Sequence, residues 1–277
     1  MRKLLPAQRL APAIRWFSFR SRRGALPALL AGMLLSLAAS VQAQTLNGLD
    51  SAAPAELTGA IAAMDEAASR QDVEQVMALI DEDFMHADGL TRDRLQQALE
   101  GLWERYDELT YTTTLDSWQQ SEDGIVAETT TEIAGLQRTD VRDFQLLATV
   151  TSRQTYRNGL LVQQETLTED NRLSSGTNPP DLQVQAPDSV PTTRNFAFDV
   201  IVPEPLGDRQ LLGTAMEEPI TPDTYLSSPR PRLELLNAGG LFKTGRAPAL
   251  SDSRWISGII IREDGMTTVT RRIRFTQ

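Results

Sequence analysis

The sequence contains no cysteine, one histidine and two lysines, so arginine carries nearly all of its positive charge. Without cysteine the chain forms no disulfide, and it has no thiolate metal ligand, no cysteine nucleophile and no leader cysteine for a lipid anchor. Its stability must come from burial of a hydrophobic core. A chain of 277 residues can supply this core if it divides into two domains of about 100 residues each.

The first 43 residues have the pattern of an export signal. They contain no acidic residue, seven basic residues and then the apolar run GALPALLAGMLLSLAASVQA (24–43). This run is too short and too rich in small residues to favour a permanent membrane span, and Val41 and Ala43 fit a signal-peptidase site. We expect residues 1–43 to be a signal peptide cleaved before Gln44, by either the general secretory or the twin-arginine route. The mature protein is then periplasmic or extracellular, with no stable membrane span.

Acidic residues dominate the mature chain. Without the seven basic residues of the leader, 20 basic and 37 acidic residues remain, which gives a net charge near −17. Nucleic acids and anionic lipids are bound by clustered Lys and Arg, so this balance argues against nucleic acid as a partner.

Two kinds of hydrophobic periodicity follow the leader. After a flexible lead-in (44–54), apolar residues recur every three or four positions from Leu57 to Met64, and Asp72 and Thr91 are placed to cap two further helices. From residue 109 the pattern alternates, is rich in Thr and aromatic residues, and is divided by the turn signals EDG and NG. Three helices followed by an antiparallel meander predict an α+β domain over residues 55–172.

The C-terminal part has a different composition. Residues 173–193 contain several prolines together with Ser, Thr, Asn and Gly, which is typical of a linker. Residues 194–277 contain only short strand patterns separated by turns, which predict a small all-β, sandwich-like domain.

The segments AIAAMDEAASRQDVEQVMALIDEDFMHADGLTRDRL (60–95) and TYRNGLLVQQETLTEDN (155–171) resemble the nuclear-transport-factor-2-like, or SnoaL-like, superfamily. The resemblance covers residues 55–172 and lies in spacing and hydrophobicity. It implies a cone-shaped, curved antiparallel sheet with three N-terminal helices around an apolar pocket. Members of this superfamily include ketosteroid isomerases, dehydratases, polyketide cyclases and non-catalytic binding proteins.

The same resemblance assigns roles to three residues. Asp88 falls where the isomerases have their general base, Met64 falls on their oxyanion-hole tyrosine, and Arg153 falls near their second oxyanion donor. Proton abstraction beside a carbonyl needs both the base and the donors that stabilise the enolate oxygen. Since the matching donors are absent, the resemblance favours binding, with an isomerase- or lyase-like enzyme that uses Asp88 as the alternative.

The residues themselves leave two interpretations of the only histidine. In a strand, His86 and Asp88 point to one face and can form an acid–base pair, which makes them the candidate catalytic residues. Alternatively, His86 lies at a pocket rim and Asp88 forms a turn before Gly89. The acidic residues around His86 lack the ligand spacing of a calcium loop, so no metal and no cofactor are expected.

Large apolar side chains gather where the helices should meet the sheet. They either line a ligand pocket or close the core. The candidate pocket residues are Met64, Phe84, Trp103, Tyr106, Tyr111 and Trp118. Near the C-terminus, TRRIRF (270–275) is either a docking edge for an acidic partner or the other domain, or a solvated strand face.

The leading functional prediction is an exported, non-catalytic protein that binds a small apolar molecule or an envelope protein in the cone. The alternatives are the Asp88 enzyme and a structural module that forms a homodimer through its curved sheet.

Overall fold

The computed structural model describes residues 52–207, 209–227 and 230–277. The predicted signal peptide, its cleavage site and the lead-in up to residue 51 lie outside these residues. Among the helices of the described residues, none is long and apolar enough to cross a membrane.

Three helices precede the long strands. They are α1 (Ala55–Ser69), α2 (Val73–Ala78) and α3 (Arg92–Trp103), with strand β1 (Ile80–His86) between α2 and α3. The Asp72 side chain accepts the backbone N–H of Gln75, and the Thr91 hydroxyl accepts that of Arg94, so α2 and α3 begin where the sequence places their caps.

One large sheet contains most of the strands, in the order β10-β9-β12-β13-β5-β4-β3-β2. Their bounds are β2 (Glu108–Ser121), β3 (Gly124–Gln137), β4 (Phe144–Arg157), β5 (Leu160–Gly176), β9 (Leu212–Pro219), β10 (Glu234–Leu235), β12 (Asp252–Arg262) and β13 (Gly265–Thr276). β1 adds in parallel to β5, and the short β7 (Ser189–Pro191) adds in parallel to β13. A mostly antiparallel sheet with few helices is therefore confirmed.

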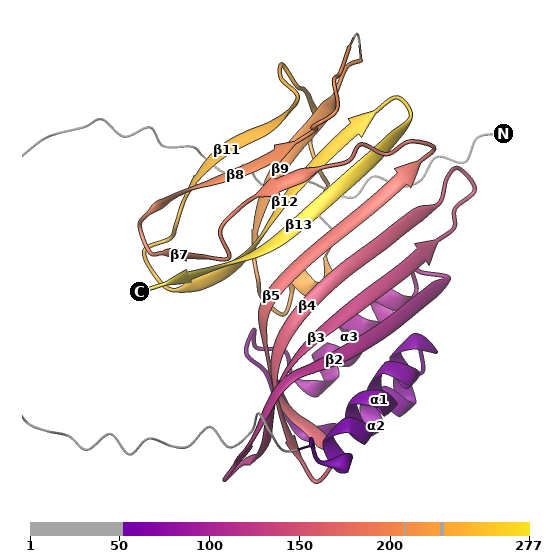
Figure 1. The fold of residues 1–277 in the computed structure, drawn as a ribbon, viewed down its shortest axis with the longest axis vertical. Helices are drawn as coiled ribbons and strands as arrows, with labels where there is room; N and C mark the ends of the chain where they lie inside the picture. Colours follow the sequence, from indigo (N-terminus) through magenta and orange to yellow (C-terminus); the bar gives the residue numbers. More distant parts are fainter. Residues whose placement is uncertain (1–51, 208, 228–229) are drawn as a thin grey trace, which may run out of the picture. The chain divides into compact units, whose positions relative to one another are not determined.

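Strand β5 runs through the predicted domain boundary (Figure 1). Near its start, Leu161 is paired with Ile80 of β1, and towards its end Asp170 is paired with Arg271 of β13. The pairing with β13 continues to Gly176, beyond the predicted boundary at residue 172. The structure thus has one continuous sheet where the sequence pattern predicted the start of a flexible linker.

The remainder of the predicted linker, up to residue 193, is packed. Leu182 and Val190 are only 3% and 4% exposed and belong to the core of the C-terminal strands. The Thr267 hydroxyl donates to the carbonyl of Pro180 at 2.8 Å. Proline removes a backbone donor but does not prevent neighbouring apolar side chains from being buried, so composition alone misidentified this segment.

A second, smaller sheet has the order β11-β8-β6. It consists of β6 (Gln183–Gln185), β8 (Asn195–Ile201) and β11 (Gly240–Arg246). Phe198 and Val200 of β8 share a buried cluster with Ile260 of β12 and Val269 of β13. Gly258 allows this close approach, because a Cβ there would lie 2.7 Å from Val200 Cγ2. The small sheet is thus a second layer over β12 and β13.

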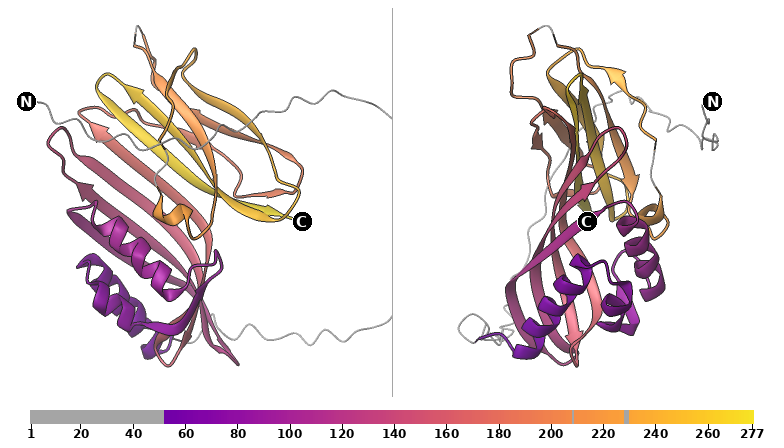
Figure 2. Two further views of the ribbon diagram at one scale, coloured as in Figure 1. Left: turned by 180° about the vertical axis from the view of Figure 1, so that it is seen from behind. Right: turned by 90° about the vertical axis from the view of Figure 1, so that its right-hand side faces the viewer.

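The helices and the small sheet lie on opposite faces of the large sheet. The Thr113 hydroxyl on β2 donates to Asp65 of α1 at 2.6 Å, which marks the helix face (Figure 2). Val269, beneath the small sheet, is paired with Arg172, and this cross-strand row continues to Thr110 on β2. Thr110 and Thr113 are an odd number of residues apart, so their side chains lie on opposite faces. We call the face of Thr110 the open face.

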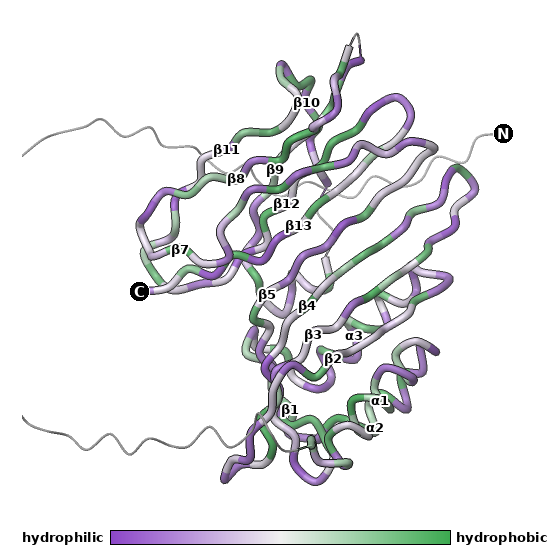
Figure 3. The backbone as a smooth tube through the Cα atoms, viewed as in Figure 1, coloured by the Kyte–Doolittle hydropathy of each residue, from purple (hydrophilic) through white to green (hydrophobic). Residues whose placement is uncertain are grey.

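Hydrophobic and hydrophilic residues mix along β2–β5, as expected for strands that are covered on one face only (Figure 3). On the helix face, the connection from β9 to β10 contains the short 3-10 helix η1 (Thr224–Leu226). The Tyr225 ring packs edge-on against Trp255 of β12, with ring centroids 4.9 Å apart. Asp223, just before η1, lies 3.5 Å from Arg94 of α3, so the C-terminal part of the chain contacts the helical part.

Candidate functional site

The predicted catalytic residue Asp88 is held by two residues from the C-terminal part of the chain. Its Oδ2 accepts from Arg272 Nη1 at 3.0 Å and from the Tyr225 hydroxyl at 2.6 Å, and its Oδ1 accepts from Arg272 Nη2. The side chains of Asp88 and Arg272 are only 8% and 3% exposed. Buried ion pairs of this bidentate kind are costly to break, because one charge is then left without a partner.

His86 is neutral and has both ring nitrogens occupied. Its Nδ1 accepts the backbone N–H of Asp88 at 3.0 Å, so the ring proton is on Nε2, which donates to the Thr166 hydroxyl at 3.2 Å. His86 Nδ1 also lies 3.3 Å from Asp88 Oδ2, but without a proton on Nδ1 this contact is not an ion pair. Burial lowers the pKa of His86, and the nearby Asp88 carboxylate only partly opposes this shift.

These contacts bear directly on the predicted acid–base pair. Strand β1 ends at His86 and Asp88 lies in the turn before Gly89, so this turn, and not strand alternation, brings the two side chains together, and both have protein partners. The Asp88 carboxylate is buried and both of its oxygens already accept hydrogen bonds, so a substrate has no open approach to it. Burial and the neighbouring Asp88 raise the pKa of Tyr225, so its hydroxyl remains a donor to Asp88. The geometry is that of a connection between two distant parts of the chain.

The six predicted pocket residues all belong to one hydrophobic cluster between the helices and the sheet. Phe84 and Trp103 are 1% and 5% exposed, and the Trp103 indole N–H donates to the Tyr111 hydroxyl at 3.0 Å. The other predicted pocket residues, Met64, Tyr106 and Trp118, are partly buried against the same cluster. Arg153, the residue near the expected oxyanion donor, lies on the open face with Glu128 at 2.9 Å and Glu165 at 3.2 Å.

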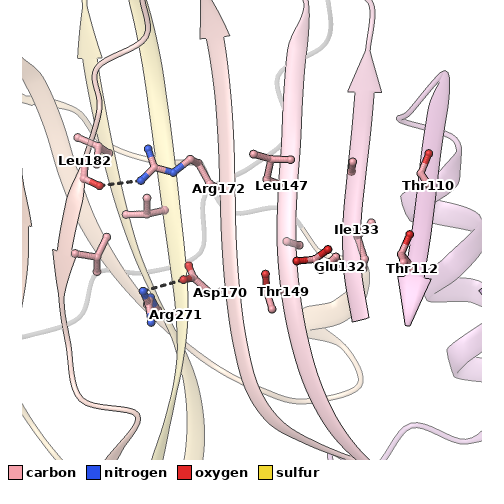
Figure 4. A pocket seen from close by; sticks show the side chains of 14 residues that line it. Thr110, Thr112, Glu132, Ile133, Leu147, Thr149, Asp170, Arg172, Leu182 and Arg271 are labelled. Atoms are coloured by element: carbon pink, nitrogen blue, oxygen red, sulfur yellow. Dashed lines mark hydrogen bonds and ion pairs between the residues drawn. The ribbon is translucent and has the colours of Figure 1, made fainter. Parts of the chain in front are cut away.

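A trough of about 480 Å³ lies on the open face of the large sheet (Figure 4). Two cross-strand rows of side chains form its floor. The first row is Thr110, Ala134, Leu147, Arg172 and Val269, and the second is Thr112, Glu132, Thr149, Asp170 and Arg271. Leu182 and Val184, from the proline-rich segment, form a wall along one side. The trough therefore exists only because that segment packs against the large sheet.

With one exception, each charged side chain of the trough has an ion-pair partner. Arg271 lies 2.8 Å from Asp170, and Arg172 lies 3.1 Å from Asp181 while it donates to the Leu182 carbonyl at 2.8 Å. Glu132 has no ion-pair partner within the described residues. Leu147, at the centre of the floor, is 59% exposed. The trough thus combines an exposed apolar centre, an unpaired carboxylate and hydroxyl groups of threonine.

Sequence reasoning did not identify this trough. Its residues come from strands that meet only once the register of five strands is known. One signal was present in TRRIRF, for which docking on the other part of the chain was one of the two interpretations. Arg271 and Arg272 both pair with acidic residues of the first part of the chain, Asp170 and Asp88.

A family model described as a domain of unknown function (DUF8623) matches residues 177–276. No protein of curated function matches the sequence significantly. The matched family segment begins directly after β5 and includes most of the predicted linker.

Several solved structures are similar to part of the chain. Bd1075 of Bdellovibrio bacteriovorus has 15% identity and a TM-score of 0.30, and the match covers 40% of this chain and 38% of that one. A putative scytalone dehydratase of Novosphingobium aromaticivorans has 17% identity and a TM-score of 0.32, over 40% of this chain and 80% of that one. A protein of ketosteroid isomerase-like fold from Catenulispora acidiphila, in complex with trimethylamine, has 12% identity and a TM-score of 0.29, over 39% and 82%. Two of these three structures are thus described as a dehydratase and a ketosteroid isomerase-like protein, and values this low assign no activity to this chain.

Proposed function

We propose that this protein is an exported, non-catalytic binding protein that holds its partner in the trough on the open face. The observation that carries this proposal is the floor of the trough, in which the exposed Leu147 lies between Ala134 and Arg172, while Arg172 and Arg271 are paired with Asp181 and Asp170. Such an arrangement offers apolar contact area with little ordering of side chains on binding.

The state of Asp88 supports binding over catalysis. The enzyme alternative requires a carboxylate free to accept a proton, whereas Asp88 accepts from Arg272 and Tyr225. The interior of the cone is less suited to binding than the trough, because the six predicted pocket residues pack in one hydrophobic cluster there.

Binding at the trough is testable without knowledge of the natural partner. We would screen a fluorinated fragment library by NMR against the mature chain and against Leu147→Glu, which places a charge at the centre of the floor. Met85→Glu is the matched control, because Met85 is also an exposed apolar residue, at 48%, and lies outside the trough on β1. We expect hits that Leu147→Glu removes and Met85→Glu retains. Hits that both variants retain would contradict the proposal.

Export and assembly belong to the same proposal. The basic leader and the Val41 and Ala43 site support a mature chain that begins at Gln44 in the periplasm or outside the cell. Mass spectrometry of the exported protein should give this N-terminus, and a soluble protein that retains its leader would contradict it. The partner is a small molecule or an envelope protein. A homodimer through the sheet would cover the same open face, so sedimentation that reveals a stable dimer would favour the structural alternative.

A further inference from the structure

We infer that the occupant of the trough is an extended polypeptide segment that adds as a strand to the free edge of β6. This inference rests on the proposed binding function of the trough and adds to it the chemical class of the partner. Within the described residues, β6 pairs with β8 only, so one edge of the small sheet ends at the wall of the trough.

The backbone direction along β6 determines what this edge presents. The Leu182 carbonyl points away from β8, because it accepts from Arg172 on β5 at 2.8 Å. Successive residues of a strand direct their backbone groups to alternate sides, so the N–H and C=O of Val184 point to the same side as the Leu182 carbonyl. Gln183 and Gln185 correspondingly face their β8 partners, Ile201 and Asp199. Val184 therefore offers one donor and one acceptor to the trough.

Unpaired backbone groups at a sheet edge are the usual receptor for an added strand. Two features favour such an addition here over a flat, solvated edge. The edge faces a floor with Leu147 at its centre rather than open solvent. Arg172 donates to the Leu182 carbonyl, so the N–H and C=O of Val184 are the next backbone groups along this edge that an added strand can bind.

The floor also indicates the side chains of the added strand. Figure 4 shows the segment of Leu182 running alongside the floor strands, so a strand added there would follow them as well. Leu147 and Glu132 belong to cross-strand rows that are two residues apart, or about 7 Å along a strand. Alternate residues of an extended peptide have the same spacing. An apolar residue over Leu147 and a basic residue near the unpaired Glu132 fit this spacing. The preferred partner is an extended segment in which apolar and basic residues alternate on one face.

The probe is the synthetic peptide acetyl-TVTKTVT-amide, whose valines and lysine share one face in an extended conformation. Its binding to the mature chain is measured by isothermal titration calorimetry. Val184→Pro removes the outward N–H of β6 while leaving the hydrogen bonds of Gln183 and Gln185 to β8, because edge strands tolerate proline at such a position. We expect this variant to bind the peptide at least tenfold more weakly.

The control is Thr244→Pro, which places a proline at an exposed position of β11, the other edge of the small sheet. We expect it to bind the peptide as the unmodified chain does. A second measurement needs no protein variant. The same peptide N-methylated at the lysine and at both valines should bind at least tenfold more weakly, because no N–H on that edge of the peptide remains to donate to the Val184 carbonyl. Replacing its lysine with glutamate should also weaken binding, owing to Glu132.

Three results would overturn the inference. Equal binding of the N-methylated and unmodified peptides would mean that the backbone of the partner is not recognised. Equal binding to Val184→Pro and the unmodified chain would exclude the β6 edge. Absence of peptide binding, together with fragment hits that depend on Leu147, would overturn strand addition while leaving the proposed binding function intact. If fragment hits were also independent of Leu147, the proposed function would fail as well.

Discussion

Replacing Asp88 with asparagine should destabilise the protein strongly, because it removes the only carboxylate that, within the described part of the chain, pairs with the buried Arg272 guanidinium. The two side chains are 8% and 3% exposed, so water cannot replace the lost partner. Breaking such a buried pair by removing one member costs about 3 to 5 kcal/mol. This is a large fraction of the roughly 5 to 15 kcal/mol by which folded proteins are stable.

The assay is urea unfolding of the mature chain at pH 7, followed by circular dichroism. Asp170→Asn is the matched control, since the Asp170–Arg271 pair also ties an arginine of β13 to the first part of the chain but is 45% and 30% exposed. An exposed pair contributes about 1 kcal/mol or less, so the control should change stability little. Asp88→Asn combined with Arg272→Met should recover part of the loss, because no unpaired charge remains. Equal destabilisation by Asp88→Asn and Asp170→Asn would refute the reasoning.

The other predictions concern the histidine, the proline-rich segment and the core. Burial lowers the pKa of His86 in the folded state, so the unfolded chain binds a proton at this residue more readily. The free energy of unfolding should therefore be highest above about pH 6.5 and fall as the pH drops below it. His86→Gln should flatten this fall in urea unfolding between pH 7 and pH 5.5. Limited proteolysis should spare residues 177–193 while the chain is folded, and early cleavage there would support a free linker. Trp103→Ala should cost about 3 to 5 kcal/mol of stability in urea unfolding, whereas a pocket role predicts a larger effect on binding than on stability.

Local features of the fold were predictable from the sequence. The caps at Asp72 and Thr91 and the change from helical to alternating periodicity depend on interactions within a few residues. A turn formed by Asp88 before Gly89 was one of the two interpretations of this stretch, and Asp88 does lie in a turn in contact with His86. Hydrophobicity alone was enough to group Met64 with the aromatic residues, since all of them enter the same core.

Long-range features were not predictable. Asp88 and Arg272 are 184 positions apart in the sequence, and only the pairing of β5 with β13 brings them together. The proline-rich segment has the composition of a linker, but its Leu182 and Val190 are buried by strands that follow it. The trough depends on the register of five strands, which a single sequence does not determine. The local pattern is strongest in the cone, and for this reason the sequence alone points to the cone as the candidate site.

The central claim is that a partner binds in the trough while the Asp88 cluster holds the two parts of the chain together. The most direct test is a titration of the methyl-labelled mature chain with the peptide probe or with fragment hits, followed by NMR. The account predicts that the methyl resonances of Leu147, Val184 and Val269 shift on binding, since these residues line the trough. Shifts confined to Leu95, Leu99 and Leu102 of α3, which pack on the core between helices and sheet, would contradict it and return the binding site to the cone.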